Sequence, residues 1–139
     1  MGNSASKEEK SFYDFSIRDI TGTHKIDFAQ FRGRVVLAVN VASKCGLTSN
    51  NYKQLVDLAD RYEPRGLSIL LFPSNQFGKQ EPGSADEVCT FIRAYSDKFI
   101  ITDKINVNGK ETHEIFEWLK KKCPGTITNT IKWNFTKVL

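Results

Sequence analysis

The stretch that decides the fold is VVLAVNVASKCG, residues 35–46. Its first eight residues form a nearly continuous β-branched and apolar run, which is typical of a strand buried on both faces of a parallel or mixed sheet. The polar turn SKCG carries Cys45 and leads into residues 49–62, where apolar side chains recur at helical spacing. The sequence therefore predicts a cysteine at the seam between a core strand and a helix.

The rest of the chain also alternates strands with helices. Ser84 stands three residues before Glu87, a capping box that predicts the start of a second helix. This order predicts an α/β fold with a mixed central sheet flanked by helices, whose chemistry gathers beyond the carboxyl ends of the strands. The other expected elements are a β-hairpin over 12–28 with its turn at 21–23, strands over 67–72 and 135–139, and a helix over 111–122.

Length and composition predict one globular domain. The chain has 139 residues, of which 40% are hydrophobic and 12% aromatic, enough to bury a real core. We expect this domain to span residues 11–139, after a disordered polar leader over 1–10. The 20 Lys and Arg residues exceed the 16 Asp and Glu residues only mildly and are spread along the chain, which argues against a nucleic-acid partner.

The cysteine pattern and the short apolar runs exclude further classes of protein. The three cysteines cannot all pair, and no Cys/His cluster with zinc-ligand spacing surrounds His24 or His113. A disulfide scaffold and a structural metal are therefore not expected. The longest apolar runs fall short of the roughly 18 residues that span a bilayer. We expect a soluble, cytoplasmic protein.

The extreme N-terminus qualifies this location. Residues 1–6, MGNSAS, fit the pattern M-G-x-x-x-[ST] for acylation of Gly2 after removal of Met1. The alternative is a plain disordered leader. A single acyl chain anchors weakly, so only a weak membrane association would follow.

Cys45 is the candidate nucleophile. Thiolates are the reactive form of cysteine, and a helix N-terminus or a nearby cation stabilises them. We expect backbone N–H groups near residues 48–49 to point toward the sulfur, with Lys44 adjacent. The alternative is a small buried filler, a common place for free cysteine. A reactive thiolate attacks disulfides, carbonyls or peroxides, and spacing alone does not choose among them.

Three motifs in order make this choice: NVASKCG at 40–46, FPSNQFGKQEPG at 72–83 and IKWNF at 131–135. Together the chain resembles the glutathione peroxidase family over residues 12–139, in particular its phospholipid-hydroperoxide and non-selenium thiol peroxidase branch. The resemblance implies a thioredoxin-like fold. It also implies a catalytic site in which the peroxidatic Cys45 is surrounded by Gln76, Trp133 and Asn134.

The resemblance implies a peroxidase that reduces hydrogen peroxide and organic or lipid hydroperoxides as an antioxidant in oxidative stress. Its reductant would be glutathione or a thioredoxin-like protein, with no bound cofactor. The short segment before IKWNF lacks the family's tetramer-forming insertion and implies a monomer. Two other functions stay open: a peroxide sensor or redox relay with little turnover, and an inactive thioredoxin-like interaction module. Taken singly, Gln76, Trp133 and Asn134 also fit structural roles.

The sequence departs from the family pattern at three points. The resolving cysteine of the thiol branch aligns with Arg93 or Ile92, and Cys89 lies about one helical turn earlier. Cys89 is therefore either a resolving cysteine that needs its helix to unwind or an inert half-buried residue. Ser74 stands where the family commonly has another cysteine. The chain stops at Leu139, where the family continues through a further strand and helix.

Overall fold

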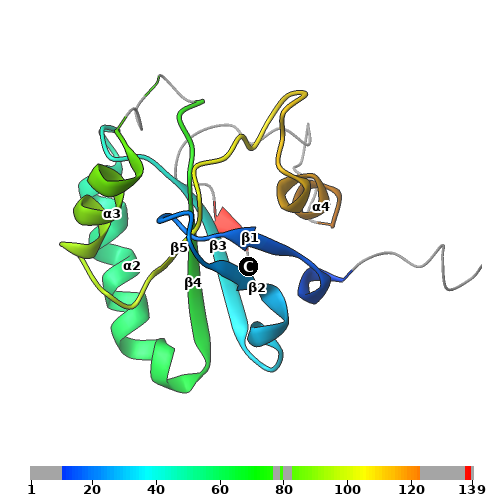
Figure 1. Cartoon of the computed structure of the whole chain (residues 1–139). Coiled ribbons are helices and arrows are strands. Elements are labelled where there is room, and N and C mark those ends of the chain that lie inside the picture. The colour runs from blue at the N-terminus through cyan, green and yellow to red at the C-terminus, as the bar shows by residue number, and fades with distance from the viewer. Residues whose placement is uncertain (1–10, 77–78, 80–82, 123–136, 139) are drawn as a thin grey trace, which may run out of the picture.

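The computed structural model describes residues 11–76, 79, 83–122 and 137–138. A four-stranded sheet with the order β5-β4-β3-β6 forms the centre, and β1 and β2 form a separate hairpin (Figure 1). The strands are β1 (Ser16–Arg18), β2 (Lys25–Asp27), β3 (Val35–Val41), β4 (Leu67–Pro73), β5 (Ile100–Ile101) and β6 (Lys137–Val138). The α-helices are α2 (Thr48–Tyr62), α3 (Ala85–Arg93) and α4 (Glu114–Lys122), and the 3-10 helices are η1 (Phe12–Asp14), η2 (Phe28–Phe31) and η3 (Glu63–Arg65).

Strands β3 and β4 form the core of the sheet. They pair in parallel over seven positions, from Val35 opposite Leu67 to Val41 opposite Pro73. Successive side chains of a strand point to opposite faces, and here both faces are covered, which explains the unbroken apolar runs. Because the two strands are parallel, their carboxyl ends meet at one edge of the sheet.

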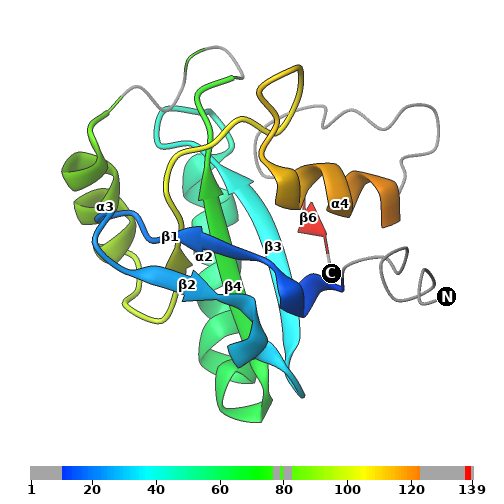
Figure 2. The same ribbon diagram turned by 45° about the vertical axis from the view of Figure 1, so that its right-hand side comes forward.

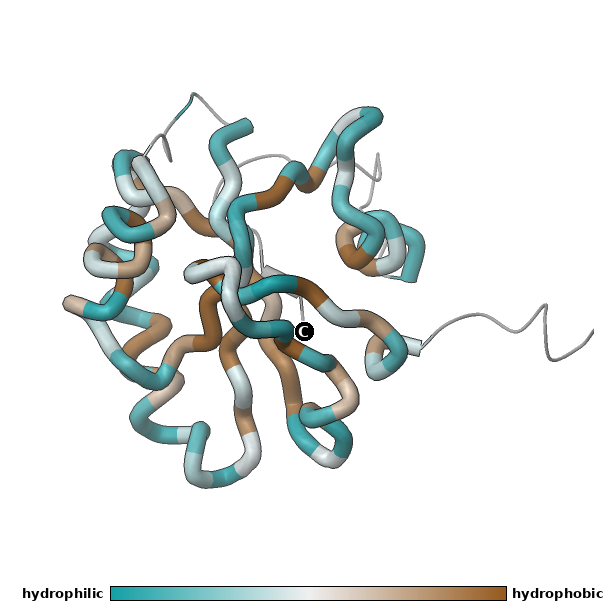
Figure 3. Tube along the Cα trace, viewed as in Figure 1, coloured by the Kyte–Doolittle hydropathy of each residue, from teal (hydrophilic) through white to brown (hydrophobic). Residues whose placement is uncertain are grey.

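Helices cover both faces of this sheet, as Figures 1 and 2 show. Leu37, Val39 and Val41 pack in one cluster with α2 and α3. Ala38 of β3 and Phe72 of β4 pack in the other cluster, with α4 and the β1-β2 hairpin. The hydropathy colouring in Figure 3 shows the apolar residues gathered along the central strands. The chain passes from β3 to β4 through α2, so this helix covers one face of the sheet.

Most predicted elements are confirmed, with three corrections. The strands β3 and β4 and the helix α2 form as expected, and Ser84 and Glu87 make the capping box of α3. The prediction of a helix from residue 111 is wrong, because Thr112 bridges to Asn106 and α4 begins only at Glu114. The predicted hairpin strands are shorter, since residues 12–14 form η1. Strand β5 was not predicted.

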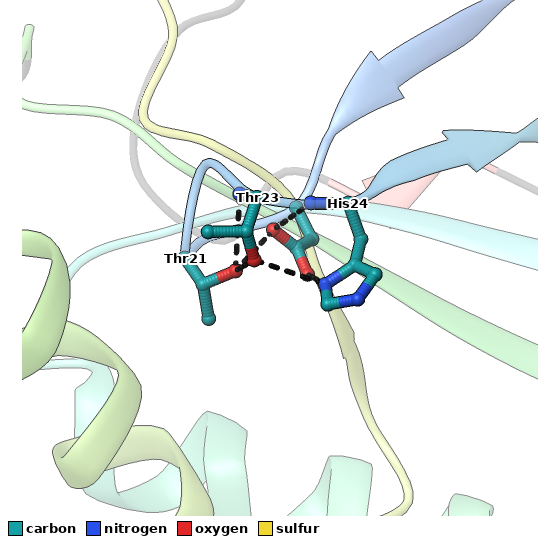
Figure 4. Close-up of polar contacts among 4 residues, drawn as sticks. Thr21, Thr23 and His24 are labelled. Carbon is teal, nitrogen blue, oxygen red and sulfur yellow. Dashed lines mark hydrogen bonds and ion pairs between the residues drawn. The ribbon is translucent and has the colours of Figure 1, made fainter.

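The hairpin turn is held by a cluster of short polar side chains, shown in Figure 4 around Thr21, Thr23 and His24. The Thr21 hydroxyl donates to the Asp19 carboxylate over 2.6 Å, and the backbone N–H of His24 approaches the same oxygen at 3.4 Å. The hydrogen bond from Thr21 is the main cause that holds the pKa of Asp19 below its ordinary value. The ionised carboxylate therefore stabilises the turn.

We expect Asp19→Asn to lower the melting temperature by a few degrees at neutral pH, because the amide loses the charge-assisted hydrogen bonds. A carboxylate with a lowered pKa in the folded state stabilises at pH values above its unfolded pKa of about 3.9 and loses that effect as the pH falls further. The difference in melting temperature between the wild type and the variant should therefore shrink in acid. Thermal unfolding at a series of pH values measures it. Asp57→Asn, which removes an exposed ion pair with Arg61 on α2, is the control. A difference that grows in acid would contradict the expectation.

Candidate functional site

Cys45 lies in the turn between the end of β3 and the start of α2. Its side chain is half-buried and packs against the cluster that includes the α2 and α3 core residues. The backbone N–H of Leu47 donates to the Cys45 sulfur over 3.4 Å. The donor is therefore Leu47, one residue before the helix. The expectation that N–H groups near residues 48–49 point toward the sulfur is corrected in part. The Thr48 N–H donates to the Cys45 carbonyl oxygen at 3.1 Å instead.

Thr48 fastens this turn. Its hydroxyl donates to the carbonyl oxygen of Ala42 over 2.7 Å and accepts the backbone N–H of Cys45 over 3.2 Å. The residue is only 4% exposed, so both bonds are shielded from water. A single hydroxyl thus joins the end of β3 to the residue that carries the thiol. Sequence reasoning missed Thr48, although a hydroxyl residue at a helix start was the available signal.

The loop after β4 meets the same edge. The backbone N–H of the buried Ser74 donates to the carbonyl oxygen of Val41 over 3.1 Å, which continues the pairing of β3 and β4 toward the Cys45 turn. The first part of the FPSNQFGKQEPG motif is therefore fixed beside the end of β3. The Ser74 hydroxyl accepts the backbone N–H of Gln76 at 3.5 Å.

The Gln76 amide binds the backbone of residues 107–108. Its oxygen accepts the N–H of Val107 at 2.6 Å and that of Asn108 at 3.0 Å, and its nitrogen donates to the Asn108 carbonyl oxygen at 2.7 Å. A side-chain amide has two acceptor positions and two N–H donors, so three of its four positions are filled. These hydrogen bonds fasten the loop after β4 to residues 107–108.

The remaining predicted residues lie partly outside the described part of the chain. Trp133, Asn134 and Gly2 are outside it, so their roles stay predictions. Cys89 lies on α3, half-buried, and packs against the same cluster as Cys45. Both described cysteines are unpaired thiols. The structure thus brings Cys89 to the border of the core that Cys45 also borders.

Charged groups around this region have other partners. Lys44 lies close enough to Glu87 to help lower the pKa of that carboxyl, although the capping hydrogen bond with Ser84 is the larger cause. His113 is half-buried, which lowers its pKa, and its Nδ1 accepts the backbone N–H of Ile115 at the start of α4. His113 therefore caps a helix as a neutral ring.

A pocket of about 530 Å³ lies between β1 and the segment that leads to α4. It is lined by both signs of charge, including Arg18, Asp103, Lys104 and His113, and Cys45 is not among its lining residues. Within the described ranges, no group of His, Cys, Asp and Glu side chains is arranged to hold a metal ion. No helix in the described part of the chain is long and apolar enough to cross a membrane.

Comparison with known proteins identifies the family of the chain. The family model of glutathione peroxidase matches residues 12–120. The chain is 49% identical over 135 residues to a phospholipid hydroperoxide glutathione peroxidase of Callithrix jacchus, covering 96% of this chain and 68% of that protein. It is 48% identical over 139 residues to the probable glutathione peroxidase 2 of Arabidopsis thaliana, covering 97% and 80%.

Two solved structures are also similar to this chain. The protein described as "Crystal structure of T. cruzi GPX1" matches with a TM-score of 0.74 and 35% identity, over 92% of this chain and 77% of that chain. A second, "Crystal structure of Trgpx in apo form", matches with a TM-score of 0.71 and 38% identity, over 94% and 77%. The predicted thioredoxin-like fold is confirmed. The chain belongs to the glutathione peroxidase family.

Proposed function

We propose that Cys45 is the peroxidatic residue of a thiol-dependent peroxidase. As a glutathione peroxidase, the chain is an oxidoreductase that reduces hydroperoxides. The observation that supports Cys45 is the Leu47 N–H that donates to its sulfur in the turn beyond the carboxyl end of β3. The sulfur is half-buried, so it remains partly accessible to a small hydroperoxide.

The reaction that follows balances in three steps. The Cys45 thiolate attacks one oxygen of the hydroperoxide, the O–O bond breaks, and a proton joins the departing oxygen, which gives an alcohol or water and a sulfenic acid. One external thiol condenses with the sulfenic acid and releases water. A second thiol attacks the mixed disulfide, which frees Cys45 and leaves the oxidised reductant as a disulfide.

Neutral donors complete the site in this proposal. Gln76, Trp133 and Asn134 supply N–H groups that stabilise sulfur and the departing oxygen without adding a base that competes for the proton. For Gln76, the proposal uses the amide N–H that is not bound to residues 107–108. Gln80, which the sequence analysis did not single out, offers a second amide in the same motif.

The substrates proposed are hydrogen peroxide and lipid hydroperoxides, the latter because the matched Callithrix jacchus protein is named a phospholipid hydroperoxide glutathione peroxidase. The reductant proposed is glutathione or a thioredoxin-like protein. A monomeric state, a cytoplasmic location and acylation of Gly2 with weak membrane attachment are proposals that rest on the sequence alone.

We expect Cys45→Ser to abolish peroxidase turnover, because a serine hydroxyl is not ionised near neutral pH and cannot attack the peroxide. Steady-state NADPH consumption through a coupled reductase, with protein far below substrate, measures turnover. Wild-type turnover by Cys45→Ser would refute the assignment. Mass spectrometry of the wild-type protein after one equivalent of peroxide distinguishes the other two functions. A Cys45 sulfenate without turnover indicates a redox relay, and an unmodified Cys45 indicates an inactive module.

We expect Cys89→Ser to leave glutathione-driven turnover unchanged, because an external thiol reaches Cys45 without help from α3. Any loss should be confined to the thioredoxin-driven reaction, in which a protein reductant needs an intramolecular disulfide as its target. Parallel kinetics with the two reductants measure this difference. A lower rate with glutathione would show that Cys89 has another role in the site.

We expect Thr48→Val to destabilise the protein by about 1–3 kcal/mol, because the buried partners of its hydroxyl lose their hydrogen bonds. The Cys45 turn then loosens, and the Leu47 N–H is no longer held against the sulfur. Without this donor, iodoacetamide should alkylate Cys45 several-fold more slowly. Urea unfolding and peptide mass spectrometry measure the two effects. Thr48→Ser keeps the hydroxyl and serves as the control. Alkylation of Thr48→Val at the wild-type rate would show that the turn does not depend on this hydroxyl.

A further inference from the structure

His113 caps α4 with its ring as well as with its backbone. Its carbonyl oxygen accepts the N–H of Phe116 at 2.9 Å and that of Glu117 at 3.1 Å, which starts the helix. Its ring Nδ1 accepts the N–H of Ile115 at 3.2 Å. Serine, threonine, aspartate and asparagine are the usual residues at this position, and their side-chain oxygens accept hydrogen bonds throughout the neutral pH range. A histidine nitrogen accepts only while the ring is neutral.

The same residue joins α4 to the turn before it. The backbone N–H of His113 donates to the carbonyl oxygen of Asn106 at 2.9 Å. Within the turn, the Thr112 hydroxyl donates to the Gly109 carbonyl oxygen at 2.6 Å, and the Thr112 N–H approaches the same oxygen at 3.3 Å. The turn is thus closed by its own hydrogen bonds, and the helix starts from a fixed point. The ring of His113 lies at the junction of these two parts.

The first turn of α4 packs against the end of β4. Ile115 is 0% exposed and Phe116 is 1% exposed. The Phe116 ring meets the Phe72 ring edge-on, with the ring centroids 4.9 Å apart. Because Ile115 is fully buried, water has little access to its N–H. A loss of the Nδ1 acceptor would therefore leave a buried donor unpaired, which destabilises this turn of the helix.

Burial is the largest influence on the charge of the His113 ring, and it lowers the pKa of that ring below its ordinary value. The carboxylates of Glu114 on α4 and of Asp103 after β5 act in the opposite direction, because they favour a positive ring. The partial positive charge of the helix N-terminus opposes a positive ring. The ring lines the pocket beside β1 together with four charged residues: Arg18, Asp103, Lys104 and Glu111.

We propose that His113 is a pH-sensitive cap that holds the first turn of α4 against β4. While the ring is neutral, Nδ1 accepts the Ile115 N–H and the turn is closed. When the ring is protonated, both of its nitrogens carry hydrogen, so the cap is lost. The first turn of α4 then opens, together with its packing on Phe72. The device is independent of the proposed reaction, because neither Cys45 nor a substrate takes part in it.

The direction of the pH effect follows from the lowered pKa. A histidine whose pKa is lower in the folded than in the unfolded state stabilises the folded protein while the ring is neutral. This contribution is complete above the unfolded-state pKa of about 6.5, and it is lost as the pH falls toward the folded-state pKa. The cap is therefore closed at neutral pH and released in mildly acidic solution.

The test compares the wild type with His113→Asn, whose amide oxygen accepts the Ile115 N–H and does not titrate. The protection factor of the Ile115 amide is measured by NMR hydrogen exchange at about pH 7.5 and about pH 5. In the wild type, we expect this factor to fall about tenfold or more in acid. In His113→Asn, it should change by less than about twofold. His113→Ala, which offers no acceptor, should give low protection at both pH values.

His24→Asn is the matched control, because it removes the other histidine of the chain from an exposed hairpin turn. This control should keep the pH response of the wild type. An NMR titration of the wild-type His113 ring should have its midpoint below about pH 6.5. A midpoint above this value, an unchanged protection factor in the wild type, or an equal fall in His113→Asn would each overturn the inference. The comparison of wild type with His113→Asn decides the question even if His113→Ala does not fold.

Discussion

The parallel pairing of β3 with β4 is the constraint on which the rest of the structure depends. Seven paired positions hold the two strands in one register, and from Leu37 to Val41 and from Ser68 to Pro73 the residues of the pair are buried. A slip by one residue would move every side chain to the opposite face, so the register is strongly fixed. The carboxyl ends of the two strands then have only one place to lie. The turn that carries Cys45 and the loop that begins at Ser74 meet there because the core leaves no alternative.

Beyond this edge the strands end, and side chains take over the hydrogen bonds that backbone groups make inside the sheet. Thr48 joins the end of β3 to the Cys45 turn, and Gln76 joins the loop after β4 to residues 107–108. Both groups are neutral. A neutral donor or acceptor holds geometry without adding a charge or a base next to the thiol. The His113 ring caps the start of α4, where its Nδ1 accepts the Ile115 N–H.

Local sequence patterns were enough to predict the elements whose causes are local. Apolar runs predicted β3 and β4, and a capping box predicted α3. The two-residue strand β5 was missed because it forms only through pairing with β4. The start of α4 was misplaced because a bridge to Asn106 holds Thr112 outside the helix. In the same way, the position of Cys45 was predictable from its strand-to-helix seam, whereas the hydrogen bond from Lys120 to the Val107 carbonyl oxygen joins two segments that no local pattern connects.

The packing of α3 bears on how oxidised Cys45 is reduced. The helix is fastened at its start by the capping box of Ser84 and at its end by Arg93, whose guanidinium donates to the carbonyl oxygens of Asp97 and Phe99. Val88 and Ile92 flank Cys89 and are buried.

If Cys89 must leave the helix to reach Cys45, unwinding exposes those two apolar side chains, at about 1.5–3 kcal/mol each, and breaks the hydrogen bonds of Arg93. The resemblance places the resolving cysteine of the family at Arg93 or its neighbour Ile92, and here Arg93 fastens the end of the helix. An external thiol meets no such barrier. The packing of α3 therefore opposes resolution by Cys89, whereas direct attack of an external thiol on the sulfenic acid of the proposed reaction needs no unwinding of α3.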